Sequence, residues 1–258
     1  MNNIVSIITP SFNSANYICH TVESVLNQSY TNWELLIVDD CSTDNSREII
    51  QSYVNKDSRI KLICLEKNSG AAVARNTGIE EARGRFIAFL DSDDTWHPEK
   101  LEKQLQFMLK NDYAFTYTQY HQVNENGDLI GDLYFPKRTN YHNLLKTCVI
   151  GCLTAMYDSH KIGKIYFPLI RKRQDYALWL KILKQIDYAY CVPMDLASYT
   201  VRSDSISANK WKAAQYNWKL YREIEQLNIF YATYCFLNYA VRGIIRTKFK
   251  KLSKFIKL

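Results

Sequence analysis

Glycine is scarce in this chain of 258 residues: there are 8 glycines, and none precedes Gly70. The sequence therefore has neither a GxGxxG turn after its first apolar segment nor a GxxxxGK[ST] loop. Dinucleotide-binding folds and P-loop enzymes are disfavoured for this reason. Sugar-phosphate nucleotidyltransferases are disfavoured too, because the residues TPSFNSANY stand where their glycine-rich loop would be.

Targeting and disulfide signals are also missing. The start MNNIVSIITPSF has no basic region, no long apolar run and no small-residue cleavage site, so we expect no signal peptide and a cytoplasmic location. The seven cysteines are an odd number in mostly apolar or mixed surroundings, which predicts free thiols. Cys148 and Cys152 have no second Cys or His pair nearby, so packing is favoured over a zinc site.

The residues that are present predict a large α/β core. The chain is 47% hydrophobic, and its apolar, β-branched runs at 4–10, 33–40, 59–66 and 85–93 read as strands buried on both faces. Helical patterns lie between them at 15–28, 44–55 and 71–83. Such alternation predicts a mostly parallel, doubly wound sheet with helices on both faces. Ligands are expected at its carboxyl edge, where the strands end on Asp39, Asp40, Asp91 and Asp93.

The remaining sequence divides the chain further. The stretches YAFTYTQYH and CLTAMYD predict strands, and NENGD at 124–128 predicts a hairpin turn. We expect three regions: a nucleotide-sugar-binding half at 1–111, an acceptor-side α+β half at 112–205, and a C-terminal helical region at 206–258.

Four motifs carry a family resemblance: residues 5–13, 34–46, 68–94 and 173–183. In this order they resemble the family 2 glycosyltransferases with a GT-A fold, and the likeness weakens after about residue 205. The resemblance implies an inverting enzyme that moves a hexose-type sugar from a UDP-sugar to a hydroxyl of a glycan acceptor, which can be lipid-linked. It also implies a role in lipopolysaccharide, capsule or other surface polysaccharide synthesis.

The resemblance assigns a metal and a donor site. The family's DxD motif matches Asp91-Ser92-Asp93, where Asp91 faces the ribose and metal and Asp93 ligates Mn²⁺ or Mg²⁺, cations that prefer oxygen ligands. The implied donor-binding residues are Thr9, Pro10, Asp39, Asp91, Arg75 and Arg202, with Asp39 at the uracil and Arg202 near the diphosphate. Asp40 stays open between a site role and a capping role, and Asp94 is expected to cap the following helix.

The same resemblance implies that Asp175 is the general base that takes the proton of the acceptor hydroxyl. Asp175 precedes residues at helical spacing and therefore sits at a helix start, where an ordinary N-cap is the alternative role. Here Gln174 stands in place of the family's usual Glu, so no shared role is carried over to that neighbour.

Two other function classes fit part of the sequence. DSDDT also matches the DxDx[TV] signature of haloacid-dehalogenase-type phosphatases, in which Asp91 would be a covalent nucleophile. That motif normally ends the first strand of its fold, whereas three strand units precede it here. A non-catalytic nucleotide-sugar or membrane-binding module would lack a base, so Asp175 and the intact DxD argue against it.

The net charge of +7 is concentrated at the end of the chain. Residues 242–258 hold seven basic residues and no acid, and the rest holds 26 basic and 26 acidic residues. From Phe230 onward, apolar and basic residues fall on opposite sides of a helix, with no apolar stretch of about 20 residues. We expect peripheral binding to the inner face of the cytoplasmic membrane, with docking of 228–240 on the domain as the alternative. Nucleic acid is disfavoured because the body has no basic face.

Overall fold

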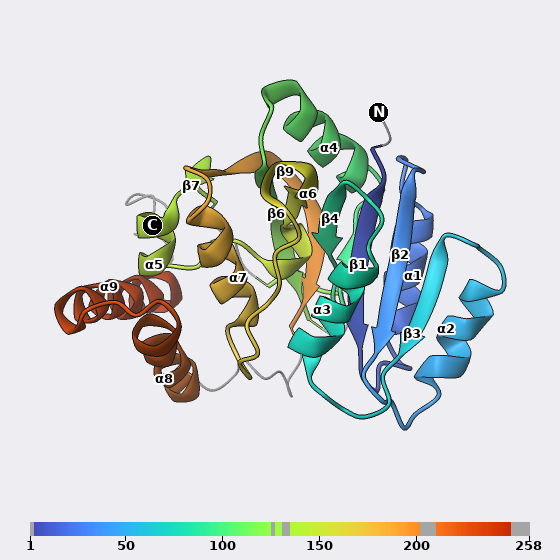
Figure 1. Cartoon of the computed structure of the whole chain (residues 1–258), viewed down its shortest axis with the longest axis horizontal. Helices are drawn as coiled ribbons and strands as arrows, with labels where there is room; N and C mark the ends of the chain where they lie inside the picture. Colours follow the sequence, from blue (N-terminus) through green and yellow to red (C-terminus); the bar gives the residue numbers. More distant parts are fainter. Residues whose placement is uncertain (1–2, 125–126, 131–134, 202–209, 249–258) are drawn as a thin grey trace.

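The computed structural model describes residues 3–124, 127–130, 135–201 and 210–248, and in 210–213 and 244–248 only the backbone (Figure 1). Its strands are β1 Val5–Ser11, β2 Trp33–Asp39, β3 Ile60–Cys64, β4 Phe86–Phe89, β5 Thr95–Trp96, β6 Phe115–Val123, β7 Arg138–Thr139, β8 Met156–Asp158 and β9 Ala189–Thr200. Its helices are α1 Ile18–Leu26, α2 Ser46–Val54, α3 Ala71–Glu81, α4 Lys100–Asn111, α5 Tyr141–Lys146, α6 Ser159–Ile162, α7 Gln174–Leu183, α8 Lys210–Lys219 and α9 Ile229–Lys248. A 3₁₀ helix spans Cys152–Thr154, and a π-helical turn spans Leu220–Ile224.

Within the described residues, the strands form one sheet in the order β3-β2-β1-β4-β8-β6-β9-β5, with β7 beside β9. The neighbours β3, β2, β1 and β4 run parallel, as the apolar runs predicted. β8 is antiparallel to both β4 and β6, and β6 and β9 are parallel again. The mostly parallel α/β sheet expected from the sequence is therefore confirmed.

Alternate residues of the first strands face two separate layers of helices. Ile8, Leu36 and Ile87 belong to the buried cluster that includes residues of α3 and α7. Ile7, Leu35 and their neighbours face α1, α2 and α4 in a second cluster. Strands covered on both sides in this way must be apolar throughout, which explains their unbroken hydrophobic runs.

Helix α3 lies unusually close to the sheet. A Cβ built on Gly78 would be 2.6 Å from Cγ2 of Ile8, a distance that side chains do not tolerate. Glycine at this position therefore lets the helix backbone approach β1. The close packing fixes the position of the side chains one turn earlier in α3, which face the carboxyl edge of the sheet.

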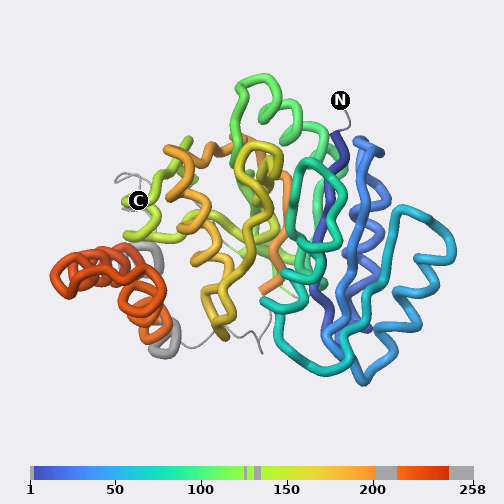
Figure 2. The backbone as a smooth tube through the Cα atoms, viewed as in Figure 1, coloured from blue at the N-terminus to red at the C-terminus, as the bar shows by residue number. Residues whose placement is uncertain are grey.

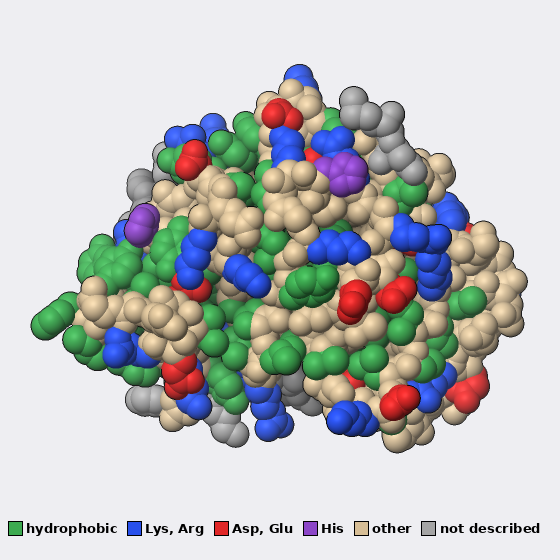
Figure 3. Space-filling model, viewed as in Figure 1, with side chains coloured by type: hydrophobic (Ala, Val, Ile, Leu, Met, Phe, Trp, Pro, Cys, Tyr) green, Lys and Arg blue, Asp and Glu red, His purple; other side chains and the backbone are tan. Residues whose placement is uncertain are grey.

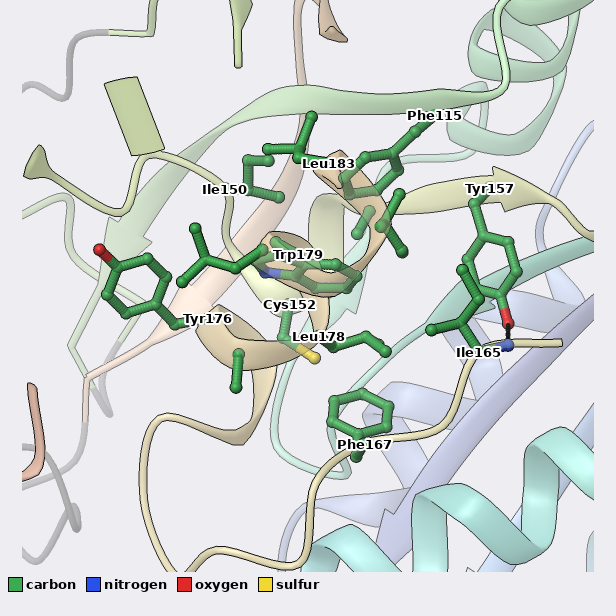
Figure 4. Close-up of a cluster of buried hydrophobic side chains, with 14 of the residues drawn as sticks. Phe115, Ile150, Cys152, Tyr157, Ile165, Phe167, Tyr176, Leu178, Trp179 and Leu183 are labelled. Carbon is green, nitrogen blue, oxygen red and sulfur yellow. Dashed lines mark hydrogen bonds between the residues drawn. The ribbon is translucent and has the colours of Figure 1, made fainter. Parts of the chain in front are cut away.

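Helix α7 is held by an aromatic cluster (Figure 4). Trp179 is fully buried, and its ring lies 5.3 Å from that of Phe115 and 5.8 Å from that of Phe89, between centroids. The Phe167 ring meets that of Phe89 edge-on at 5.1 Å. This packing attaches α7 to the strands that lead into the carboxyl edge.

The second half of the sheet departs from its sequence prediction in two places. CLTAMYD forms the 3₁₀ helix and the three-residue β8 instead of one strand. The turn after Asn124 forms, with the Gly127 N–H donating to the Asn124 carbonyl at 3.0 Å. Within the described residues, the hairpin beyond it contains one bridge, between Val123 and Leu129.

Helices α8 and α9 lie at the end of the molecule opposite β3 and α2 (Figure 2). Ala232 and Cys235 of α9 are buried in the core, so this part of the helix does dock on the domain. A second apolar face remains exposed: Phe230 is 85% exposed and Leu237 58%. Hydrophobic side chains also gather over this end in the space-filling view (Figure 3). Within the described part of the chain, no helix combines the length and apolar character needed to cross a bilayer.

Candidate active site at the carboxyl edge of the sheet

Asp39 is the last residue of β2 and is completely buried beside Ser11 of β1. Its Oδ2 accepts hydrogen bonds from the Ser42 N–H at 3.0 Å and from Nε of Arg47 at 2.6 Å. Its Oδ1 is buried without a hydrogen-bond partner among the described residues. A buried carboxylate oxygen left in this state is costly unless a ligand donor reaches it.

Thr9 has a similar unpaired atom on the same side of the sheet. Its Oγ1 is buried and has no hydrogen-bond partner among the residues that the structure describes. Thr9 precedes Ser11 by two positions, and Ser11 pairs with Asp39, so strand alternation places all three on one face. Pro10 points to the other face by the same rule. The structure thus brings Thr9 and Asp39 together at the predicted base pocket.

Asp40, whose role the sequence left open, caps α3. Its two carboxylate oxygens accept the N–H groups of Ser69 at 2.7 Å and Gly70 at 2.8 Å. Gly70 is the N-cap residue of α3 and has φ +89°, which glycine adopts without strain. The capping alternative is therefore the one that the structure supports, since the negative charge also suits the positive end of the helix dipole.

Arg75 of α3 connects the DxD segment to α7. Its Nη2 donates to Oδ1 of Asp91 at 2.5 Å, and its Nη1 donates to Oε1 of Gln174 at 3.1 Å. Burial lowers the pKa of Arg75, but the adjacent Asp91 carboxylate outweighs this and raises it above its ordinary value. The guanidinium is thus a permanent cation that orients Asp91 and the first residue of α7.

Asn76, the next residue of α3, holds the segment before α7. Its side-chain oxygen accepts the Phe167 N–H at 2.7 Å, and its amide donates to the Phe167 carbonyl at 2.9 Å. Gln174 in turn donates from Nε2 to the Ile170 carbonyl at 2.7 Å. The sequence ARN therefore serves to fix the start of α7 against the DxD segment, a role that the motif alone did not reveal.

Asp94 is not the helix cap that the sequence suggested. Helix α4 begins at Lys100 with Glu99 as its N-cap residue. Asp94 is buried instead, and its Oδ1 accepts the Thr200 N–H at 3.0 Å while its own N–H donates to the Asp91 carbonyl at 3.1 Å. The prediction failed because β5 intervenes before the helix and pairs with the distant strand β9.

The DxD turn concentrates negative charge. Burial raises the pKa of the Asp94 carboxyl well above its usual range, and the charges of Asp91 and Asp93 raise it further. Arg75 forms an ion pair with Asp91 and so brings a positive charge to this group of carboxylates. Asp91 keeps 29% of its side chain exposed, and only its Oδ1 is engaged in the ion pair with Arg75. Clustered carboxylates of this kind fit a hard divalent cation.

Asp175 is the second residue of α7 and is half-buried. The N-cap residue of the helix is Arg173, with φ +63°, and its side chain makes no capping hydrogen bond. Within the described part of the chain, no hydrogen bond engages the Asp175 carboxylate. The ordinary capping role is therefore not observed, and the carboxylate is available to a ligand while the helix dipole stabilises its charge.

Two further residues complete the comparison with the sequence. Cys152 lies beside these charges, and burial together with the nearby Asp91 raises the pKa of its thiol well above the usual value. All seven cysteines are free, as predicted. Arg202 lies outside the described residues, so its predicted place near the diphosphate stays a prediction.

Sequence comparisons identify the family to which the chain belongs. A family model described as glycosyl transferase family 2 matches residues 6–162. TuaG of Bacillus subtilis, named for teichuronic acid biosynthesis, is 50% identical over 242 residues, 93% of this chain and 96% of its own. The Escherichia coli protein WfgD, named as a UDP-Glc:alpha-D-GlcNAc-diphosphoundecaprenol beta-1,3-glucosyltransferase, is 43% identical over 247 residues, which cover 95% and 96% of the two chains.

Solved structures share the fold at low sequence identity. Staphylococcus aureus TarS 1–349 in complex with UDP-GlcNAc has a TM-score of 0.72 and 22% identity, over 94% of this chain and 73% of that one. The match to another, longer TarS chain covers 96% of this chain and 44% of that one. The mannosyltransferase PcManGT of Pyrobaculum calidifontis, in complex with GDP-Man and Mn²⁺, has a TM-score of 0.68 and 16% identity, over 95% and 75% of the two chains. These likenesses show a GT-A fold. The comparisons lend no support to the phosphatase or the non-catalytic alternative.

Proposed function

This chain is a member of glycosyl transferase family 2, and on that premise we propose that it transfers a hexose-type sugar, with inversion, from a UDP-sugar to a hydroxyl of a glycan acceptor in surface polysaccharide synthesis. The names of TuaG and WfgD, which match nearly the whole chain, support the class of acceptor. The observation that carries the donor assignment is the unpaired, buried Oδ1 of Asp39.

Uracil suits this pocket because of its hydrogen-bonding edge. Its N3–H is a donor, and Oδ1 of Asp39 is an acceptor that lacks one. Oδ2 is already taken by Ser42 and Arg47, so the carboxylate cannot rotate without losing both bonds. The hydroxyl of Thr9, also unpaired, offers a second polar contact on the same face.

We expect Asp39→Asn to lower the affinity for UDP by about 10- to 100-fold and to raise that for CDP. The Ser42 N–H and Arg47 require an oxygen acceptor, so the asparagine NH₂ must take the place of Oδ1. Two donors would then face each other at uracil N3, which costs about 1–3 kcal/mol. Cytosine N3 is an acceptor and would instead gain a bond.

Isothermal calorimetry with UDP and CDP measures both changes. Asp57→Asn is the matched control, because Asp57 pairs with Arg59 beyond the end of α2 and away from the pocket. Unchanged preference for UDP in Asp39→Asn would show that the base binds elsewhere.

Asp175 is proposed to act as the general base at the other side of the site. The acceptor hydroxyl would lose its proton to this carboxylate as its oxygen attacks the anomeric carbon, on the face opposite the departing UDP. Arg75 acts at a distance from that step by orienting Asp91 and Gln174. Gln174 accepts a hydrogen bond from Arg75 without adding a further negative charge.

A divalent cation fits the DxD turn. Asp93 and Asp91 would hold Mn²⁺ or Mg²⁺, which when bound would neutralise the developing charge of the UDP leaving group. The closeness of Asp91, Asp93 and Asp94 in the sequence supports this assignment, and the PcManGT complex with Mn²⁺ shares the fold.

The C-terminal region is proposed to hold the enzyme on the inner face of the cytoplasmic membrane, near a lipid-linked acceptor. Phe230, Tyr234, Leu237 and Val241 of α9 are all about half exposed or more, and their spacing places them on one helix face. The seven basic residues of 242–258 follow directly. Apolar insertion combined with cationic attraction is the usual basis of peripheral binding to anionic lipid.

The full chain should co-sediment with vesicles that contain phosphatidylglycerol and not with phosphatidylcholine vesicles, and salt should weaken the binding. Replacing Lys250, Lys251 and Lys254 together by glutamine should release it, since each basic residue contributes on the order of 1 kcal/mol. Replacing the exposed Lys56, Lys67 and Lys110 by glutamine removes the same charge outside the tail and should leave vesicle binding unchanged. Equal loss from both triple variants would contradict a membrane role for the tail.

A further inference from the structure

Three potential metal ligands meet away from the DxD turn. His97 follows β5, His121 lies on β6, and Asp195 lies on β9. One ligand atom from each residue lies within 4.8 Å of the others. Nδ1 of His121 is 2.8 Å from Oδ2 of Asp195, and the two imidazole rings are 5.4 Å apart between centroids. The group thus draws on three strands that are distant in the sequence.

A bulge in the sheet produces this convergence. Gln119 pairs with Asp195, but two residues later His121 pairs with Ser198, so β9 contains one extra residue between them. In a regular strand Asp195 and Ser198 would face opposite sides. The extra residue brings both onto the His121 ring, where Ser198 Oγ lies 2.9 Å from Nε2.

The contact with Ser198 leaves Nδ1 as the nitrogen of His121 that can bind a metal ion. With the ring proton on Nε2, this N–H donates to Oγ of Ser198, and the unprotonated Nδ1 lies on the side of Asp195. Metal-binding histidines commonly have their second nitrogen held in this way. Within the described part of the chain, no hydrogen bond occupies the imidazole of His97, whose backbone N–H is anchored to the Leu196 carbonyl at 3.0 Å.

We propose that His97, His121 and Asp195 form a binding site for Zn²⁺ or a similar transition-metal ion, separate from the DxD site. Two imidazoles and one carboxylate suit such ions, whereas Mn²⁺ and Mg²⁺ at the DxD turn are held by oxygen. Tetrahedral geometry needs ligand atoms about 3.3 Å apart. The His121–Asp195 contact therefore has to open by about half an ångström, and Asp195, with 46% of its side chain exposed, can move that far.

The bound ion would clamp β5, β6 and β9 together near the active site. Strand β9, which pairs with β5 at Ala197 and Ser198, continues to Thr200, whose N–H donates to Oδ1 of Asp94 beside the DxD motif. Occupancy of the site would therefore stiffen the backbone that supports Asp91 and Asp93. The three protein ligands would leave the fourth coordination position to water.

Tag-free protein stripped of metal with a chelator should bind one equivalent of Co²⁺ with the strong visible absorption of a tetrahedral site, and Zn²⁺ should displace it. Zn²⁺ should also raise Tm, because the folded state binds it preferentially. His97→Gln and Asp195→Asn should each weaken Zn²⁺ binding by about 100-fold or more, measured by competition with a chromophoric chelator. No nucleotide is present, so the result is independent of the proposed transferase activity.

Two control variants show whether the Co²⁺ absorption arises from this site. His142→Gln removes a histidine that bonds Tyr231 on the far side of the fold and should leave the absorption intact. Asp93→Ala disables the DxD turn and should also leave it intact. Absence of the tetrahedral bands in wild-type protein, or bands that survive in His97→Gln and Asp195→Asn, would overturn the proposal and leave His121 and Asp195 as a simple hydrogen-bonded pair.

Discussion

Asp175→Asn is expected to lower kcat by about 10² or more while the affinity for UDP stays near that of the wild type. The substitution keeps the size of the side chain but removes its capacity to accept a proton. No observed hydrogen bond within the described residues depends on this carboxylate, and α7 is anchored by Gln174 and by the buried Trp179. The loss should therefore appear in turnover and not in stability.

Steady-state transfer kinetics and UDP calorimetry on the same preparations separate these effects. Asp187→Asn is the matched control: it makes the same change at an exposed position just beyond α7 and should retain full activity. A variant at Asp175 that keeps most of its turnover would place the base elsewhere. The anomeric configuration of the product provides an independent test, since a single displacement requires inversion.

The sequence predicted the first half of the sheet well because the signal there is strong. β1, β2 and β4 are buried on both faces, so each forms an apolar run that begins and ends within a few residues of the predicted limits. The second half contains β5 and β7, of two residues each. Segments that short have no periodicity to detect, and their pairing is decided by β9, far along the chain.

In the candidate site, too, features set by neighbouring residues could be predicted, and contacts between residues far apart in the sequence could not. The presence of carboxylates at the strand ends could be predicted, but their individual partners could not. Asp40 caps α3 through Ser69 and Gly70, about 30 residues away, and its local sequence fits either role. Asp94 was assigned to a helix start because capping signals are local, whereas its acceptor function depends on Thr200, 106 residues later.

The role of Arg75 illustrates how packing adds what motifs leave out. The family resemblance predicts a contact with the nucleotide, and the structure adds hydrogen bonds to Asp91 and Gln174, the latter 99 residues away. That arrangement depends on the close approach of α3 to β1 at Gly78. One buried guanidinium thus connects Asp91 of the DxD turn with Gln174, the residue that precedes the proposed base.

Removal of the divalent cation should abolish turnover, and Asp93→Ala should lower it by at least about 10²-fold even at saturating metal. Stabilising the charge of a leaving diphosphate is worth several kcal/mol, and each 1.4 kcal/mol changes the rate tenfold. In the folded protein Asp91 shares one oxygen with Arg75, and the family resemblance assigns the metal to Asp93. Removing the Asp93 carboxylate should therefore lower the turnover rate nearly as much as removing the metal ion does.

The measurement compares transfer rates and UDP affinity with Mn²⁺, with Mg²⁺ and with EDTA. Wild-type protein should lose activity in EDTA and regain it with either cation, and its UDP affinity should be higher with metal than without. In Asp93→Ala this metal-dependent gain in affinity should disappear, while binding in EDTA should equal that of the wild type, because the contacts that hold Asp39 come from Ser42 and Arg47 and do not involve Asp93. Turnover that persists in EDTA would exclude the metal-assisted mechanism. If metal raised the UDP affinity of Asp93→Ala as much as that of the wild type, Asp93 would not be a metal ligand.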